Sequence, residues 1–215
     1  MVVLKIGKKT VDLPYTVRIP DVSEKLFDEL AQDEDLKAEL INGVMVMPMP
    51  AHLIHDDISG FVRALMSFFA DEMGLGDVLG PDSIVHLATC RKFCPDTYFV
   101  RKGTLSRPLP KEFHGVPQLV LEVLSEHHRA DDLDDKLPAY QAAGVAEIWY
   151  IDPEKKELRV YRKQRRSCQE EVLRSGKVSS AVLRGFWIDV AWLWKAPLPN
   201  RLTCLNRILR SAKTD

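Results

Sequence analysis

The segment from residue 118 to residue 152 constrains the fold of this chain more than any other. It reads QLVLEVLS, then ADDLDDKLPAYQAAG with a helical pattern, then EIWYID. The two apolar runs have the continuous hydrophobic character of strands that are covered on both faces. Gly144 is a typical C-terminal stop for the helix between them. This strand–helix–strand order predicts two parallel strands joined by a crossover helix.

The rest of the chain predicts further helices and strands around this unit. Asn42–Gly43 between two apolar runs indicates a tight hairpin, because the primed turns need positive φ. Helices are expected over 23–33, 52–71 and 200–212, strand-rich regions around 77–88 and 96–100, and an antiparallel pair from ELRVYRK and EEVLRS. Together these elements predict an α/β fold around a mixed sheet.

Size, charge and cysteine content narrow the class of protein. A chain of 215 residues suits one domain, and its net charge of −1 excludes a uniformly basic DNA-coating protein but not a local basic patch. No apolar stretch is long enough for a signal peptide or a membrane span. The four cysteines have no regular spacing, so we expect free thiols and a cytoplasmic protein. His86, Cys90 and Cys94 do not have the spacing of a zinc site.

Glu122 interrupts the first apolar strand near its carboxyl end. Ligands bind at this end of the strands in open α/β sheets, although a strand glutamate can also reach solvent or an arginine. Asp96 follows Pro95 and heads the strand TYFV, so the two acids can lie on neighbouring strands. Two carboxylates about 4 Å apart repel by about 4 kcal/mol at an effective dielectric constant of about 20. Such a pair needs a cation, a proton or a base, and magnesium prefers carboxylate ligands.

Lys136 stands about one turn into the predicted helix that follows Glu122. Its flexible side chain can bring the ammonium over the strand end, where it can stabilise charge on a phosphoryl group. A solvated surface position is the default for a lysine, and the spacing alone leaves both interpretations open.

These residues are similar to a known family. The chain resembles the Uma-two family of restriction endonucleases, within the PD-(D/E)XK nuclease superfamily. The matching pieces are ELINGVMVMPMP, HLIH, CPDTYFV, LVLEVLS, DDLDDKLPAYQAAGVAEIWYIDP and LRGFWIDV. The resemblance implies a restriction-endonuclease-like core, with a central mixed β-sheet flanked by helices and with N-terminal β-hairpin and helix additions. It predicts one domain over 1–215, with its core over about 36–190 and a C-terminal helix at 200–212.

The resemblance also implies a catalytic set. Asp96 and Glu122 would be the metal ligands, Lys136 the catalytic lysine, and Glu39 an acid contributed from the N-terminal part. The superfamily usually places its lysine two residues after the glutamate, where this chain has Leu124. The lysine of this family stands in the following helix, at Lys136.

Several other residues match the family pattern as supporting positions. Asp132 would share a helix face with Lys136 and cap the helix or hold the lysine. Ser125 also matches, and His55 would have a positional or capping role, as would His52. Tyr140 matches as well and is expected to pack in the core. We expect His127 and His128 to lie in a solvated loop.

The stretch 155–166, KKELRVYRKQRR, holds seven basic residues against one glutamate. Its candidates for contact with a nucleic-acid backbone are Arg159, Lys163, Arg165 and Arg166. The alternative is a solvated edge strand, in which lysines block unwanted pairing. The residues do not decide between the two.

The leading hypothesis is a Mg²⁺- or Mn²⁺-dependent endonuclease that hydrolyses DNA phosphodiester bonds. One rival is a catalytically weak or inactive nucleic-acid-binding module of the same fold, and another is an enzyme acting on RNA or a small phosphoester. Many such nucleases are homodimers because two strands need two cuts. The segment with Trp187, Trp192 and Trp194 can form such an interface or belong to the core.

Overall fold

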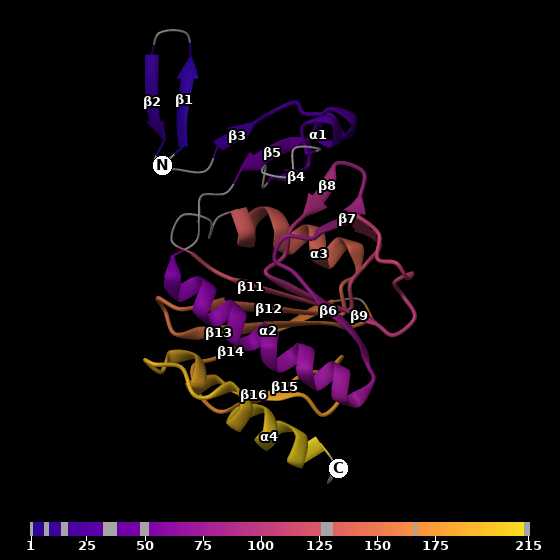
Figure 1. Ribbon diagram of the computed structural model, residues 1–215, viewed down its shortest axis with the longest axis vertical. Coiled ribbons are helices and arrows are strands. Elements are labelled where there is room, and N and C mark those ends of the chain that lie inside the picture. The colour runs from indigo at the N-terminus through magenta and orange to yellow at the C-terminus, as the bar shows by residue number, and fades with distance from the viewer. Residues whose placement is uncertain are drawn as a thin grey trace.

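Two six-stranded sheets, two two-stranded sheets and four α-helices make up the described part of the molecule (Figure 1). The structure is a computed structural model that describes residues 2–6, 9–13, 17–31, 38–47, 52–125, 131–165 and 167–212. The first sheet has the strand order β10-β7-β8-β4-β5-β3 and the second the order β14-β13-β12-β11-β9-β6. Both sheets mix parallel and antiparallel neighbours, as the sequence predicts for the fold class.

The second sheet contains the predicted strand–helix–strand unit. Its strands are β6 (Gly76–Leu79), β9 (Thr97–Arg101), β11 (Leu119–Val123), β12 (Glu147–Asp152), β13 (Glu157–Lys163) and β14 (Cys168–Leu173). β11 and β12 are parallel, with Glu122 opposite Tyr150. β9 lies antiparallel to β11 on its other side. The predicted parallel pair and the antiparallel pairing of β13 with β14 are both confirmed.

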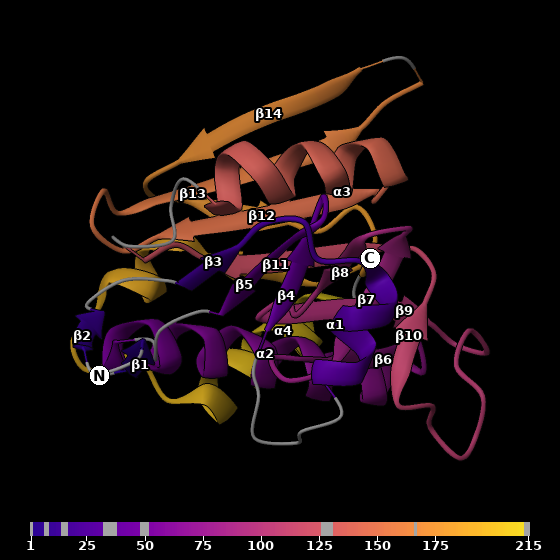
Figure 2. The ribbon, with the colours of Figure 1, turned by 90° about the horizontal axis from the view of Figure 1, so that it is seen from above.

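Side chains alternate across this sheet with the period of two that strands impose. Leu119, Leu121 and Val123 of β11 belong to the core cluster that includes α2 (Leu53–Met73) and α4 (Arg201–Ala212). Val120 belongs to a second cluster, which includes α3 (Leu137–Ala143). Glu122 therefore shares its face with Val120 and points to the side of α3. Figure 2 shows α3 lying along β12 and β13, viewed from above.

The face opposite α3 is covered by α2, α4 and the C-terminal segments β15 (Lys177–Ser179), β16 (Trp187–Asp189) and η2 (Val190–Trp194). Trp187 and Trp192 are buried in this core, and Trp194 packs against it. The core interpretation of this segment is therefore the correct one. Helix α2 ends at Gly74, whose φ of 63° is the left-handed geometry of a C-cap.

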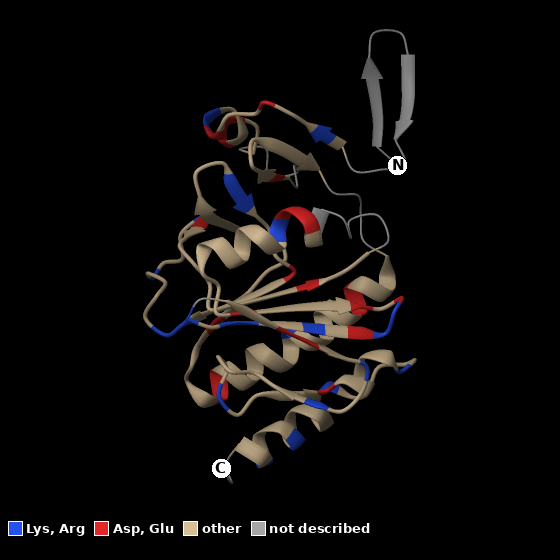
Figure 3. Cartoon of the chain, turned by 180° about the vertical axis from the view of Figure 1, so that it is seen from behind, with Lys and Arg blue, Asp and Glu red and all other residues tan. Residues whose placement is uncertain are grey.

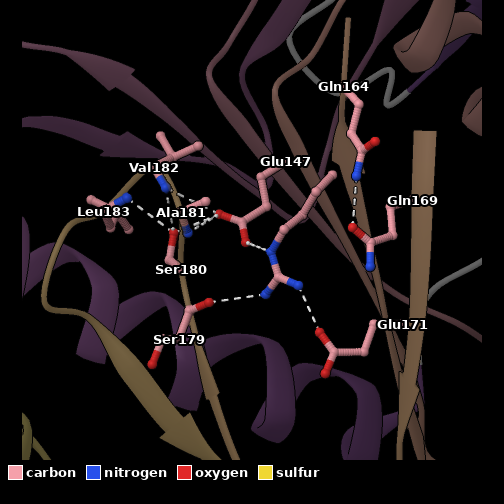
Figure 4. Close-up of polar contacts among 10 residues, drawn as sticks. Glu147, Gln164, Gln169, Glu171, Ser179, Ser180, Ala181, Val182 and Leu183 are labelled. Atoms are coloured by element: carbon pink, nitrogen blue, oxygen red, sulfur yellow. Dashed lines mark hydrogen bonds and ion pairs between the residues drawn. The ribbon is translucent and has the colours of Figure 1, made fainter. Parts of the chain in front are cut away.

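A buried glutamate fastens the C-terminal segments to the sheet (Figure 4). Glu147 begins β12 and is completely buried. Its Oε2 accepts hydrogen bonds from the Ser180 hydroxyl at 2.6 Å and from the Ala181 N–H at 3.0 Å. Its Oε1 lies 3.2 Å from Arg162 Nε. The charge of Glu147 is thus balanced by an arginine and by local donors.

The first sheet carries the predicted hairpin and the first helix. Its strands are β3 (Val17–Ile19), β4 (Glu39–Ile41), β5 (Val44–Met47), β7 (Ile84–Ala88), β8 (Arg91–Phe93) and β10 (Glu112–His114), and α1 spans Glu24–Leu30. Asn42 and Gly43 connect β4 to β5 with φ values of 52° and 83°, which confirms the turn. Ser23 caps α1 by accepting the Leu26 N–H. A further hairpin, β1 (Val2–Ile6) with β2 (Lys9–Leu13), is not evident from the sequence.

Helix α3 lies between the two sheets. Its Ala139 and Tyr140 pack in one cluster with Ile41 and Phe93 of the first sheet and Ile148 of the second. The helix is preceded by a π-helical turn, η1 (Asp131–Lys136), instead of the regular α-helical start that the sequence suggests. Pro138 has no N–H to donate to the carbonyl of the residue four positions before it, so a regular α-helical hydrogen bond is missing at this point. Within the part of the chain that the structure describes, no helix is long and apolar enough to cross a membrane.

Candidate active site

Four segments that are distant in sequence bring charged side chains together between the two sheets. Glu39 comes from β4 of the first sheet, and Glu122 comes from β11 of the second. Asp96 stands immediately before β9, and Lys136 is the last residue of η1. Glu39, Glu122 and Lys136 are only 5%, 3% and 7% exposed. The four residues that the sequence singles out as catalytic candidates thus lie in one cluster.

Lys136 joins the two glutamates. Its Nζ lies 2.9 Å from Glu39 Oε2 and 3.7 Å from Glu122 Oε1. The other oxygen of Glu39 accepts the Cys94 N–H at 2.7 Å. The interpretation of Lys136 as a solvated surface lysine is therefore wrong. The π-helical turn explains its position, since η1 ends on Lys136 and presents this residue to the space between the sheets.

Asp96 and Glu122 are linked reciprocally across neighbouring strands. The Asp96 N–H donates to Glu122 Oε2 at 3.1 Å, and the Val123 N–H donates to Asp96 Oδ2 at 2.7 Å. His55 Nε2 lies 3.1 Å from the same Oδ2 atom. His55 is in the first turn of α2, so the start of this helix is in contact with the aspartate. His52 precedes the helix as its N-cap residue, but its side chain does not cap the helix.

Gly80 permits the close approach of two chain segments at Asp96. A Cβ atom at position 80 would lie 2.6 Å from the Asp96 carbonyl oxygen and 2.8 Å from that of Pro95. The φ of Gly80 is +115°, which L side chains rarely adopt. Glycine is thus required for the backbone of Asp96 to sit where it does. The Gly80–Pro81 dipeptide is a turn signal in the sequence, but the sequence does not connect it to Asp96.

Tyr140 has a polar role in addition to the expected packing. Its ring packs edge-on against Phe93, with 5.4 Å between the ring centroids, and its hydroxyl donates to Glu122 Oε1 at 2.8 Å. Burial, and then the neighbouring Glu122 carboxylate, raise the pKa of Tyr140 well above its usual range. The hydroxyl therefore stays protonated and remains a hydrogen-bond donor to Glu122.

Within the part of the chain that the structure describes, the arrangement carries more negative than positive charge. Three carboxylates, of Glu39, Asp96 and Glu122, share one lysine ammonium and the imidazole of His55. Among the described residues, both polar contacts of the Asp96 side chain use Oδ2, so Oδ1 is the atom that can reach an ion. Carboxylate oxygens from two adjacent strands are the donor set that a hard divalent cation prefers. The residues present fit such a cation.

The remaining supporting candidates, Ser125 and Asp132, are near Glu122 and Lys136 in the sequence. Ser125 is partly buried just beyond β11. Asp132 belongs to η1, but its side chain is outside the described part of the structure, as are His127 and His128. Asp135 of the same turn pairs with Arg18 of β3 at 3.0 Å, a contact between the helix start and the first sheet.

The basic stretch does not form an edge strand. β13 lies between β12 and β14, so the edge-strand interpretation is wrong. Arg159 is within ion-pair distance of Glu157 and Glu170, at 3.3 Å and 3.7 Å. Figure 3 shows acidic and basic stretches interspersed along the strands at the β13–β14 edge of the second sheet. Lys163 and Arg165 are exposed, and Arg166 lies outside the described residues.

Comparisons with known proteins point to nucleases. The model of the family Uma2, described as "Putative restriction endonuclease", matches residues 24–191. A solved structure described as a "putative nuclease belonging to DUF820", from Anabaena variabilis ATCC 29413, is similar with a TM-score of 0.70 and 18% sequence identity. The similarity covers 80% of this chain and 97% of that chain, and at this identity it shows a common fold. No curated protein matches the chain.

Proposed function

We propose that this chain, which belongs to the Uma2 family, is a metal-dependent endonuclease that hydrolyses phosphodiester bonds of DNA. The observation that carries the proposal is the convergence of Glu39, Asp96, Glu122 and Lys136 on one buried cluster between the sheets. A purely structural cluster would balance its charges, whereas the described residues of this one place three carboxylates around one lysine. The excess negative charge supports a site for a cation.

Asp96 and Glu122 would hold a Mg²⁺ or Mn²⁺ ion. Such an ion polarises the phosphoryl oxygen and activates water when it is bound. The Tyr140 hydroxyl and the Asp96 N–H fix the carboxylate of Glu122. His55 and the Val123 N–H fix Oδ2 of Asp96. These contacts preorganise both ligands, which is what precise placement of a reacting phosphate requires.

Lys136 would act on the charge that develops on the phosphate. Glu39 holds the ammonium 2.9 Å from its own Oε2, and the ammonium is 3.7 Å from Glu122. An ammonium fixed beside the metal ligands can stabilise a phosphoryl transition state without reorganisation. Glu39 is then a positioning residue for Lys136.

Cutting both strands of a duplex with one site per chain requires two chains, so the proposal extends to a homodimer on DNA. Sedimentation of the protein with and without a duplex measures this directly. A monomer that cuts only one strand would restrict the proposal to nicking.

The test is cleavage of duplex DNA, single-stranded DNA and RNA, with Mg²⁺, with Mn²⁺ and with a chelator. The wild-type protein is compared with Asp96→Asn and Lys136→Met, and with Asp71→Asn as a control at an exposed acid of α2. The expected result is metal-dependent cleavage of DNA by the wild type and by Asp71→Asn alone. Cleavage of RNA alone would overturn the DNA assignment, and absence of cleavage on every substrate would favour a binding module.

A further inference from the structure

A second cluster of ionisable side chains lies on the first sheet, apart from the candidate active site. His86 of β7 and His114 of β10 are direct partners in a parallel strand pair, so their side chains leave the same face of the sheet. Their Nδ1 atoms are 3.1 Å apart, and the ring centroids are 4.8 Å apart. The two imidazoles thus face each other through their Nδ1 atoms.

The other nitrogen of each ring faces a carboxylate. His86 Nε2 lies 3.1 Å from Glu24 Oε1 of α1, and His114 Nε2 lies 2.8 Å from Glu112 Oε1 of β10. A carboxylate beside Nε2 leaves Nδ1 as the ring nitrogen that faces the other imidazole. At 3.1 Å the two Nδ1 atoms are close enough to share one proton or to bind one common cation.

We propose that His86 and His114 bind a transition-metal ion of the Zn²⁺ class through their Nδ1 atoms, with the carboxylate of Glu112 as the third protein ligand. Tetrahedral ligands at about 2.0–2.1 Å from zinc lie about 3.3 Å from one another, close to the observed nitrogen separation. Ligand atoms of all three residues lie within 4.8 Å of one another. The carboxylate of Glu24 on the outer nitrogen of His86 is the usual second-shell partner of a ligating imidazole.

The charges around the pair favour a cation. Glu24, Asp28 and Glu112 surround the two imidazoles, and Lys92 opposes them with its Nζ 2.6 Å from Asp28 and 3.2 Å from Glu112. Lys92 is 3% exposed. Among the described residues, three carboxylates thus stand against one ammonium beside the two imidazoles, which leaves an excess of negative charge for an added ion.

The side chain of His114 is 63% exposed, so an ion can reach the site from solvent and a water molecule can complete its coordination. The ligand types separate this site from the candidate active site. Imidazole nitrogens favour zinc-class ions, whereas the carboxylates of Asp96 and Glu122 favour Mg²⁺ or Mn²⁺.

This site was hidden in the sequence because its ligands come from two strands that pair only in the folded sheet. The four-residue spacing of His86, Cys90 and Cys94 does not identify the proposed ligands His114 and Glu112. In the structure the Cys94 thiol faces the Ala38 carbonyl oxygen at 3.8 Å, and Cys90 donates its N–H to Glu24. Glu24 thus supports the loop after β7 as well as His86.

The experiment is calorimetric titration of metal-free protein with Zn²⁺. The variants are His86→Ala and His114→Ala, with His52→Ala as the control at a histidine outside the cluster and Asp96→Asn as the control for the candidate active site. The expected result is a Zn²⁺ site of the same affinity in the wild type and in both controls. Binding should weaken at least tenfold in His86→Ala and in His114→Ala.

Nuclear magnetic resonance of the imidazole nitrogens provides a readout that does not depend on the folding of a variant. Adding Zn²⁺ to the wild type should shift Nδ1 of His86 and His114 in the manner of a ligating nitrogen. The proposal fails if these Nδ1 signals do not respond to Zn²⁺, or if correctly folded His86→Ala and His114→Ala bind Zn²⁺ as tightly as the wild type.

Discussion

Two buried glutamates stand at opposite ends of one parallel strand pair, Glu147 at the start of β12 and Glu122 near the end of β11. Glu147 points to the side of α2 and α4, where a serine hydroxyl, backbone N–H groups and Arg162 satisfy it. Glu122 points to the side of α3, where, among the described residues, Asp96 and Glu39 add two more carboxylates around one lysine. Burial alone therefore does not distinguish a structural acid from a functional one.

The difference lies in the partners. A buried ion pair with full hydrogen bonding holds elements together, and breaking it leaves an uncompensated charge. A cluster of like charges costs stability and is retained where a ligand compensates it. The carboxyl end of the strands is also where open α/β sheets bind their ligands, and only Glu122 stands there.

The largest expected effect is on catalysis. Asp96→Asn should reduce metal-dependent DNA cleavage by about 100- to 1,000-fold, because the amide removes an ion ligand. The free energy of unfolding should stay unchanged or rise, because one of three clustered carboxylates is lost. Gel-based cleavage kinetics and urea denaturation measure the two quantities. A large loss of stability would make Asp96 a structural acid like Glu147 and remove the contrast.

Glu147→Ala should show the opposite behaviour. The free energy of unfolding should fall by about 3 kcal/mol, because Arg162 and the donors around Ser180 lose their acceptor. Cleavage per folded molecule should be unchanged. Denaturation in urea gives the first value, and cleavage rates corrected for the folded fraction give the second. A cleavage defect in fully folded protein would contradict the assignment of Glu147 as purely structural.

Gly80→Ala tests whether backbone placement controls the site. The added Cβ would overlap the carbonyl oxygens of Pro95 and Asp96, so the free energy of unfolding should fall by about 1–3 kcal/mol. Displacement of Asp96 should lower the cleavage rate by about tenfold or more. Gly103→Ala is the matched control, because Gly103 also has positive φ, at +82°, but no atom lies within 4 Å of its added Cβ. Equal effects on cleavage in the two variants would exclude the role of Gly80.

Tyr140→Phe should have the smallest effect. Loss of its hydrogen bond to Glu122 should cost about 1–2 kcal/mol near neutral pH. The raised pKa of Tyr140 means that folding protects its proton, so its contribution is complete below pH 10 and declines as pH rises above 10, where the unfolded chain ionises. Urea denaturation at pH 8 and at pH 10.5–11 measures the free energy of unfolding. This free energy should decline less between the two pH values in the variant than in the wild type. An identical decline would show that Tyr140 is not the group responsible.

Local patterns in the sequence were sufficient for much of the fold. The apolar strands at 119–123 and 147–152, the Asn42–Gly43 turn and the cap at Ser23 follow from side-chain periodicity and turn chemistry, which act over a few residues. Glu122 also stood out locally, because a charge within an apolar run is costly.

Only the tertiary structure decided which of these groups meet. The sequence did not show that Lys136 would be buried against Glu39, because that contact depends on α3 lying between two sheets and on the π-helical turn that ends at Lys136. Nor did it show the strand pairing that aligns His86 with His114. Residue type and spacing determine what each segment forms, whereas contacts between distant segments depend on sheet order and register, which are settled by packing of the whole chain.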